Sequence, residues 1–242
     1  MLLRLTLEYD GTEFHGWARQ PGLRTVEGVL GEGLDSVFPA WSKLHVAGRT
    51  DAGVHALAQV ASLTVDGGPP PEHAAEALNA VLPPDVAVVA ASQAPPGFHA
   101  RFSARSRSYR YRIDRRATPS PFEARRSWWL PQPLDEECLH AAAALLPGEH
   151  DFRAFTPTET QHDVFVRVVE RAEWRRVGHS LEFEITADSF LRHMVRTLVG
   201  TMVDLGPDEL AGLLAGAPRE RAGRTAPPHG LYLIGVAYDQ ER

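Results

Sequence analysis

The chain has 242 residues, of which 43% are hydrophobic and 23% are charged, a composition typical of a globular protein that buries a substantial core. Its formal net charge of −6 argues weakly against a polyanionic partner. No apolar run approaches the roughly 20 residues that a membrane-spanning helix needs, and the alternating start of the chain does not resemble a signal peptide. We therefore expect a cytoplasmic protein.

The first part of the chain alternates between strand and helix patterns. In chain order we predict a strand at 2–9, a helix at 26–38 with Thr25 as N-cap, strands at 44–47 and 54–65, a helix from the proline-rich break at 69–71 to 82, and a strand at 85–91. This β-α-β-β-α-β order is that of the ferredoxin-like fold, in which helices cover one face of a mostly antiparallel sheet.

The second part repeats that order of elements, without a repeat of residues. We predict a strand at 108–113, a helix at 134–146, a hairpin of strands at 166–176 and 180–186, a helix at 189–205 capped by Asp188, a helix at 207–215 and a strand at 231–238. The single cysteine, Cys138, cannot form an internal disulfide and is expected to be a small buried hydrophobic residue.

These patterns predict an α+β protein of two ferredoxin-like, or RRM-like, halves with mostly antiparallel sheets. We place the N-terminal domain at 1–104 and the C-terminal domain at 105–242. Two such halves are expected to meet around a central cleft, where binding sites commonly occur.

The loop between the predicted strands at 44–47 and 54–65 has the composition of a site. Arg49 and Asp51 lie between Gly48 and Gly53, and glycines permit positive φ angles and close approach of a ligand. In an extended segment both charged side chains would point to one side, and their pairing would keep Asp51 ionised, as a nucleophile or base requires. A tight turn with a surface ion pair accounts for the same residues.

Arginines cluster around the predicted strand at 108–113. Seven arginines and one acid, Asp114, lie between 101 and 116, which predicts a locally basic surface. One face of the strand carries Arg107, Tyr109 and Tyr111, and the other carries Arg110 and Arg112. Aromatic rings stack on bases and arginines hold phosphates, so the pattern suits a nucleic acid. Both tyrosines can also be core residues, which is the favoured interpretation for Tyr111.

Other candidates flank the predicted cleft. Arg192 and Arg196 are four residues apart on the predicted helix, where two neighbouring cations suit an anion, although a solvated helix face is the ordinary alternative. His99 and Arg101 are candidates to line the cleft, and a structural role is the alternative for His99.

Several classes of site lack their signatures. The histidines are scattered without metal-ligand spacing, and neither a Walker loop nor a dinucleotide-binding fingerprint is present. The Gly-x-Ser-x-Gly elbow of serine hydrolases is also absent. We expect no metal and no cofactor, and Asp51 is the best catalytic candidate.

Seven motifs follow one another across nearly the whole chain. They are Tyr9-Asp10-Gly11 with Phe14, Gly16-Trp17 and Gln20; Gly48-Arg49-Thr50-Asp51-Ala52-Gly53-Val54-His55; Asn79 with Leu82-Pro83 and Asp85; Phe98-His99-Ala100-Arg101-Phe102-Ser103-Ala104; Arg107-x-Tyr109-x-Tyr111; Phe190-Leu191 with Met194-Val195-Arg196; and Gly230-Leu231-Tyr232. Together they resemble the bacterial tRNA pseudouridine synthase A family, and the second motif is the most specific.

The resemblance implies a pseudouridine synthase fold and the modification of uridines 38 to 40 in the anticodon arm of tRNA. It makes Asp51 the essential carboxylate, with Arg49 as its partner and as a candidate to occupy the place of the displaced nucleotide. It also implies that Tyr109 packs on the target base and that Arg196 lies near the carboxylate. A homodimer bridged by tRNA is expected, without metal or cofactor.

Further substrate-binding candidates are His99, Arg101, Arg107 and Arg110. The stretch from Phe155 to Arg167 departs from the family, since only its final arginine fits the expected threonine-x-arginine pattern.

The chemistry leaves three routes open, because Asp51 could attack C1′, add to C6 or remove a sugar proton. The main alternative function is a non-catalytic RNA-binding protein of two RRM-like modules, with the tyrosines as a stacking platform. A glycoside hydrolase would need a second acid at a fixed separation, for which the sequence offers no clear partner.

Overall fold

The computed structural model describes residues 1–160 and 163–239, which form two compact units. Unit 1 contains Met1–Arg107 and the described residues from Leu233 onward, and unit 2 contains Ser108–Tyr232. The division after residue 107 lies close to the boundary expected after residue 104. The last strand, β10 (Leu231–Tyr238), runs mostly in unit 1, so the C-terminal residues return to the first half of the chain.

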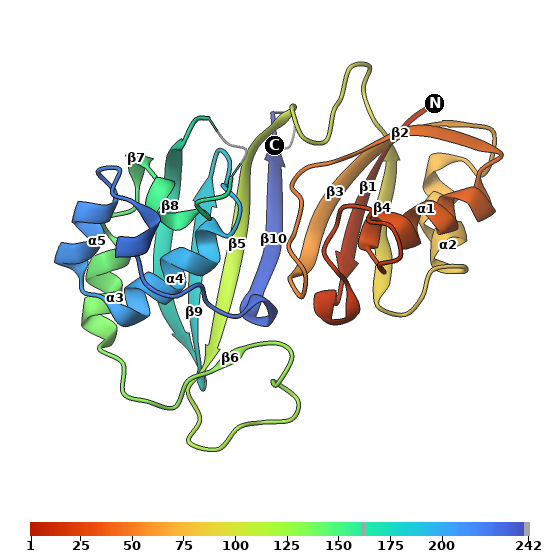
Figure 1. Cartoon of the computed structure of the whole chain (residues 1–242). Coiled ribbons are helices and arrows are strands. Elements are labelled where there is room, and N and C mark those ends of the chain that lie inside the picture. Colours follow the sequence, from red (N-terminus) through yellow and green to blue (C-terminus); the bar gives the residue numbers. More distant parts are fainter. Residues whose placement is uncertain (161–162, 240–242) are drawn as a thin grey trace. The chain divides into compact units, whose positions relative to one another are not determined.

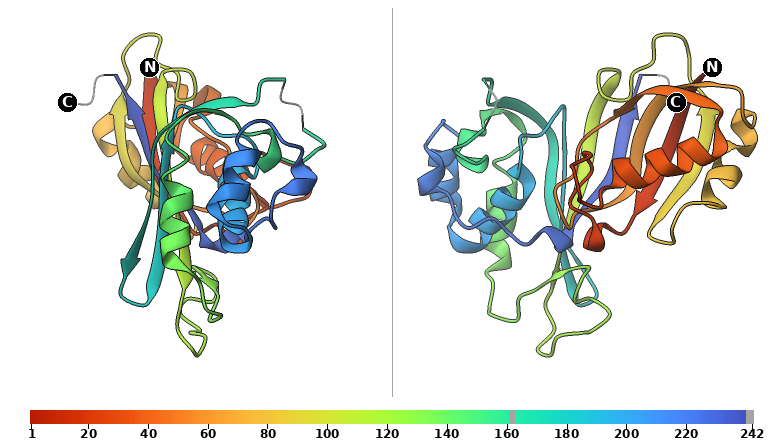
Figure 2. Two further views of the ribbon diagram at one scale, coloured as in Figure 1. Left: turned by 90° about the vertical axis from the view of Figure 1, so that its left-hand side faces the viewer. Right: turned by 45° about the vertical axis from the view of Figure 1, so that its right-hand side comes forward.

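Unit 1 has the predicted β-α-β-β-α-β order. Its elements are β1 (Leu2–Tyr9), α1 (Val26–Val37), β2 (Ala40–Val46), β3 (His55–Asp66), α2 (Pro71–Asn79) and β4 (Val86–Gln93). The strands follow the order β4-β1-β3-β10, with β2 also paired to β3, and β1 is antiparallel to both β3 and β4. Helices α1 and α2 lie side by side on one face of this sheet (Figure 2).

The local signals of unit 1 explain where its elements begin. The Thr25 hydroxyl accepts the backbone N–H of Gly28, which confirms the N-cap of α1. Strand β2 starts at Ala40, four positions before the predicted start at residue 44. The reason is an irregularity in its pairing with β3 between Ser42 and His45, where Lys43 has a φ of 59°. This bulge breaks the two-residue alternation from which a strand is predicted.

Unit 2 is the second α+β half (Figure 1). Its elements are β5 (Ala104–Asp114), whose first residues to Arg107 belong to unit 1, β6 (Trp128–Trp129), α3 (Glu136–Ala143), β7 (Gly148–Asp151), β8 (Val166–Val177), β9 (Ser180–Ala187), α4 (Met194–Asp204) and α5 (Pro207–Leu213). The strand order is β5-β9-β8-β7, with β6 parallel beside β5. The predicted β8–β9 hairpin is confirmed, and its turn places Gly178 at a φ of 58°. Two α+β halves with mostly antiparallel pairing confirm the predicted fold class.

The helix predicted at 189–205 is wrong in its first part. Helix α4 begins at Met194, after His193 in the left-handed conformation at a φ of 62°. The Asp188 carboxylate does not cap this helix. It accepts the backbone N–H groups of Val168 and Ser189 instead, which ties the end of β9 to β8 and keeps the chain from entering a helix there.

Cys138 is also placed differently from the prediction, because its side chain is exposed. In α3 the buried positions are Leu139, Ala142 and Ala143. Cys138 precedes Leu139 by one residue, which places it about 100° around the helix axis and outside this stripe. Among the described helices, none is long and apolar enough to cross a membrane.

Candidate active site

The loop that joins β2 to β3 carries Asp51, whose side chain is half-buried. The backbone N–H of Val54 donates to the Asp51 carbonyl at 3.2 Å, and Gly53 has a φ of 75°. A β-turn with a positive φ at its third position requires glycine there. Asp51 is thus the first residue of a tight turn immediately before β3.

This turn changes the expected relation between Arg49 and Asp51. Arg49 is exposed and forms no hydrogen bond or ion pair within the described part of the chain. The ion pair with Asp51 that the spacing predicts is therefore wrong. The chain does not continue as a strand through residue 51, so the alternation of side chains on which the expectation depends does not apply.

A buried polar network lies next to the turn. The Tyr9 and Thr50 hydroxyls are 2.8 Å apart, and the Gln59 amide nitrogen donates to the Tyr9 oxygen at 3.3 Å and to the Gly48 carbonyl at 2.6 Å. Because the amide nitrogen can only donate, the Tyr9 oxygen accepts from it and has its own proton available for Thr50. Tyr9 of β1 and Gln59 of β3 thus tie residues 48 and 50 to the sheet of unit 1.

Replacing Tyr9 with Phe should lower the free energy of unfolding by about 1 to 2 kcal/mol near neutral pH, because Thr50 and Gln59 lose a buried partner. Burial raises the pKa of Tyr9 from 10.0 to about 12. The folded state therefore keeps a proton that the unfolded state releases. The stability from this group is complete below pH 10 and is lost as pH rises toward 12, at up to ~1.4 kcal/mol per pH unit.

Urea unfolding of the native protein and of Tyr9→Phe, repeated from about pH 8 to about pH 11, tests this pKa. The difference between the two free energies should shrink as pH rises, because only the native protein contains the Tyr9 phenol. Contributions from other groups are common to both proteins and cancel. A difference that stays constant over this range would contradict a raised pKa for Tyr9.

The loop after β1 supports the same turn from the other side. The Trp17 N–H donates to the Thr50 carbonyl at 3.0 Å, and the Gly53 N–H donates to the Phe14 carbonyl at 3.2 Å. Trp17 and Phe14 are both buried. Gly16, with a φ of +87°, lies so close that an added Cβ would be 2.8 Å from the Thr50 oxygen. The chain on both sides of Asp51 is therefore bonded to residues 14–17.

No role was predicted from the sequence for these supporting residues. The Gly11 N–H also donates to His55 Nδ1 at 3.0 Å, which fixes the first residue of β3. The available signal was a glycine-rich loop that contains Phe14 and Trp17. Two large aromatic residues in such a loop indicate a segment that packs against the body of the protein.

In unit 2, Tyr109 and Tyr111 both lie on β5. Tyr109 is 8% exposed and meets the Phe190 ring edge-on, with ring centroids 4.9 Å apart. Tyr111 is fully buried and donates to the Pro227 carbonyl at 2.8 Å, which confirms its core role. Burial raises the pKa of Tyr111, and the positive charge of Arg196 partly offsets this effect.

Arg196 is half-buried on α4. Its Nε donates to the Ala226 carbonyl at 2.8 Å, and the Ala226 N–H donates back to the Arg196 carbonyl at 3.0 Å. These bonds hold the guanidinium near the phenol of Tyr111. Arg192 precedes α4 and is exposed, so the predicted pair of arginines on one helix face is wrong.

The arginines of β5 are largely matched by acids or carbonyl groups. Arg107 is buried, and its Nη2 donates to the carbonyls of Ala47 at 2.9 Å and Arg101 at 2.6 Å. Arg110 pairs with Glu184 at 2.8 Å and Glu182 at 3.4 Å, and Arg112 pairs with Glu123 at 3.2 Å and Glu182 at 3.5 Å. Arg105 pairs with Asp239. The positive charge expected along this strand is thus partly offset by acids, of which Glu182, Glu184 and Asp239 lie far away in the sequence.

His99 has a structural role in its own loop. Its Nδ1 accepts the backbone N–H groups of Arg101 at 3.1 Å and Phe102 at 3.3 Å. Its ring stacks on His45, with centroids 4.0 Å apart. Burial, together with the nearby His45 and Arg101, lowers the pKa of His99. The Arg101 side chain is exposed.

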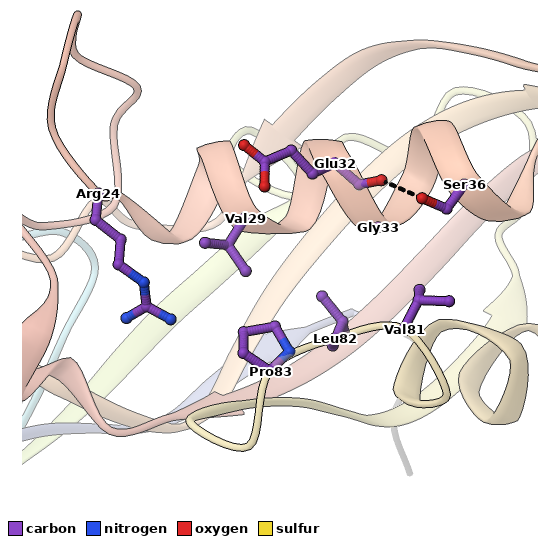
Figure 3. Close-up of a pocket in the computed structure, with 8 residues that line it drawn as sticks. All are labelled: Arg24, Val29, Glu32, Gly33, Ser36, Val81, Leu82 and Pro83. Atoms are coloured by element: carbon purple, nitrogen blue, oxygen red, sulfur yellow. Dashed lines mark hydrogen bonds between the residues drawn. The ribbon is translucent and has the colours of Figure 1, made fainter.

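A hollow in unit 1 contains none of the predicted site residues in its lining (Figure 3). Its lining consists of Arg24, Val29, Glu32, Gly33, Ser36, Val81, Leu82 and Pro83. Arg24 is held by two bonds to the Asp85 carboxylate, at 2.7 and 2.9 Å.

Within residues 1–160 and 163–239, no group of three or more His, Cys, Asp or Glu residues is arranged to hold a metal ion. Of the divergent stretch at 155–167, residues 161 and 162 lie outside the described residues.

Comparison with known proteins gives a consistent set of relatives. A family model described as tRNA pseudouridine synthase matches residues 6–103 and 142–239. One chain of the crystal structure of a Cbf5-Nop10-Gar1 complex superimposes with a TM-score of 0.41 and 11% identity, over 96% of this chain and 48% of that one. That likeness is too weak to bear on the fold.

Curated relatives match over almost their full length. The chain is 42% identical to tRNA pseudouridine synthase A of Paramagnetospirillum magneticum, over 97% of this chain and 94% of that protein. It is 43% identical to the protein of the same name from Thermus thermophilus, over 99% and 98% respectively. The corresponding Bacillus subtilis protein is 40% identical, over 99% of this chain and 100% of its own length.

Proposed function

The chain belongs to the tRNA pseudouridine synthase family, and we propose that it converts uridine to pseudouridine at positions 38, 39 and 40 in the anticodon stem-loop of tRNA. Membership makes it an isomerase, an intramolecular transferase that acts on uridine in tRNA. The observation that carries the finer proposal is that relatives at 40 to 43% identity span nearly the full chain, each a tRNA pseudouridine synthase A.

We assign the essential carboxylate to Asp51. The reaction breaks the bond from N1 to C1′ and forms one from C5 to C1′. C5 loses a proton and N1 gains one, so reactant and product are isomers and no redox step is needed. Attack on C1′, addition to C6 and removal of a sugar proton all require an ionised carboxylate at a fixed position. The bonds that hold residues 50 and 53 from two sides supply that fixed position.

Other residues are assigned supporting roles. A base-paired uridine must leave the helix, which costs a few kcal/mol, and an exposed, unpaired guanidinium such as that of Arg49 suits the place that the nucleotide vacates. Tyr109 is proposed to pack on the target base, and Arg196 to stabilise the charge that develops near the carboxylate. His99 and Arg101 are proposed to contact the RNA.

Arg107 and Arg110 are given positioning roles, because their guanidinium groups are bonded to backbone carbonyls and to Glu184 respectively. Such bonds fix the strand that carries Tyr109. The proposed partners are tRNA and a second copy of the chain in a homodimer, with the protein acting in the cytoplasm. No cofactor is invoked.

The direct test is to map pseudouridine in tRNA after incubation with the protein. A transcript with uridines at positions 38, 39 and 40 should gain pseudouridine there, and a matched transcript with cytidines at these positions should gain none. Modification at other uridines would contradict the proposed positions. Binding without any modification would favour a non-catalytic RNA-binding protein.

A further inference from the structure

The segment from Arg115 to Trp129, named here the 115–129 loop, carries features that the proposed function does not use. It follows β5 and lies between the two ranges that the family model matches. In Figures 1 and 2 it projects beyond the ends of the strands of unit 2. Phe122, in this loop, is 86% exposed, more than any other large apolar side chain in the described residues.

The loop is held in place at several points. Residues Trp128 and Trp129 pair with the end of β5, and the Trp129 indole N–H donates to the Arg116 carbonyl at 2.9 Å. The Tyr232 hydroxyl donates to the Arg126 carbonyl at 2.7 Å. Phe122 is therefore exposed on a loop that these bonds hold in place. Because its ring stays in contact with water, folding does not gain the free energy that burial of this apolar surface would contribute.

The tip around Phe122 is itself a closed turn. The Ser120 hydroxyl accepts the Phe122 N–H at 3.2 Å, and the Ser120 carbonyl accepts the Glu123 N–H at 3.1 Å. The Glu123 carbonyl in turn accepts the N–H groups of Arg126 and Ser127. These bonds keep the aromatic ring at the outer end of the loop.

The charge of the loop indicates the chemistry of its partner. It contains four arginines, at 115, 116, 125 and 126, and one acid, Glu123. The Glu123 carboxylate is engaged by Arg112 from β5, and Arg116 is paired with Asp114 at the end of β5, at 2.8 Å. Arg125 and Arg126 are exposed. A positive surface in a chain with a net charge of −6 is suited to bind a polyanion. An exposed aromatic ring beside arginines is the combination that binds unpaired bases and their phosphates.

We propose that the 115–129 loop is a tRNA-binding surface, in which Phe122 stacks on an unpaired base and Arg125 and Arg126 bind neighbouring phosphates. The proposal rests on tRNA being the substrate. It adds a contact formed by residues outside the loop of Asp51, so it concerns affinity for tRNA and leaves the chemical step unchanged.

Stacking is tested with Phe122→Ala, with Phe122→Trp as the conservative variant. Phe122→Ala should raise the tRNA dissociation constant and KM by about tenfold, the usual order for one stacked base, while kcat at saturating tRNA is unchanged. Phe122→Trp should restore binding, because its ring also stacks. The ring is exposed, so neither variant should change the melting temperature. As a matched control, Val89→Ala removes apolar surface from a 57% exposed side chain on β4 and should leave binding intact.

The phosphate contacts are tested by the salt dependence of binding. The double variant Arg125→Ala, Arg126→Ala should lower the slope of log affinity against log salt by about 1 to 2. Phe122→Ala should weaken binding without changing this slope. Arg171→Ala serves as the control, because Arg171 is an exposed arginine elsewhere in unit 2 that pairs with Glu173.

The outcomes separate this inference from the proposed function. Native protein that forms no pseudouridine in tRNA would overturn the function itself. Active native protein with unchanged binding in Phe122→Ala and the double arginine variant would overturn only the loop's role. A change of oligomeric state in Phe122→Ala, seen by sedimentation, would instead assign the loop to a contact between copies of the chain.

Discussion

Asp51→Asn should abolish pseudouridine formation in an anticodon-arm transcript, while the affinity for tRNA falls by less than about tenfold. Asparagine has nearly the shape of aspartate but no negative charge, so it can neither attack C1′ or C6 nor remove a sugar proton. The turn should survive the change, because the substitution leaves in place the bonds of the Asp51 backbone and of its neighbours, Thr50 and Gly53.

Single-turnover assays and tRNA binding by the same preparation measure the two quantities separately. Asp66→Asn provides the control, since Asp66 is an exposed aspartate at the other end of β3. It should retain native activity and affinity. Substantial pseudouridine formation by Asp51→Asn would exclude Asp51 as the essential group. A loss of binding as large as the loss of activity would assign it to RNA contact.

Local patterns in the sequence were sufficient for much of the fold. In β1, Leu3, Leu5 and Leu7 are all fully buried, as the alternation predicts, and the element order of unit 1 follows from such periods. The location of β10 could not be predicted in this way. The alternation of apolar and polar residues predicts which face of a strand is buried. It does not predict which sheet the strand joins, because that depends on residues distant in the chain.

The errors at Asp188 and His193 have a related cause. Leu191, Met194 and Val195 continue a helical spacing, and Asp188 is a good N-cap by composition. The alternative partner of Asp188 is the N–H of Val168, 20 residues away. Side-chain bonds of this kind compete with helix formation, and no local window of sequence contains both partners.

In the candidate site, too, the local features could be predicted from the sequence and the long-range contacts could not. Asp51 stood out because its own neighbours are Arg49 and glycines, a local signal. The Tyr9–Thr50 bond joins residues 41 apart, and the ion pair of Arg110 with Glu184 joins residues 74 apart. Sequence alone therefore located the loop but could not predict what holds it, nor which arginines are already matched by acids.

Gly16→Ala should reduce both stability and activity, because the loop after β1 has no space for a side chain at this position. The φ of +87° disfavours any Cβ by about 1 to 2 kcal/mol. In addition, the new Cβ would lie 2.8 Å from the Thr50 oxygen and 3.2 Å from the Asp51 carbonyl carbon. The contact is with backbone, so the turn that carries Asp51 must move.

Gly22→Ala separates these two effects, because Gly22 has a similar φ of +71° but nothing within 4 Å of the added Cβ. Both variants should show the backbone cost in urea unfolding, and Gly16→Ala should lose more. Only Gly16→Ala should lower kcat, by about a hundredfold, the usual consequence of displacing a catalytic group by ~1 Å. Equal activity in the two variants would mean that the bonds between residues 14–17 and the turn do not position Asp51. Loss of activity in Gly16→Ala with little loss of stability would show that the contact acts on the placement of the carboxylate more than on folding.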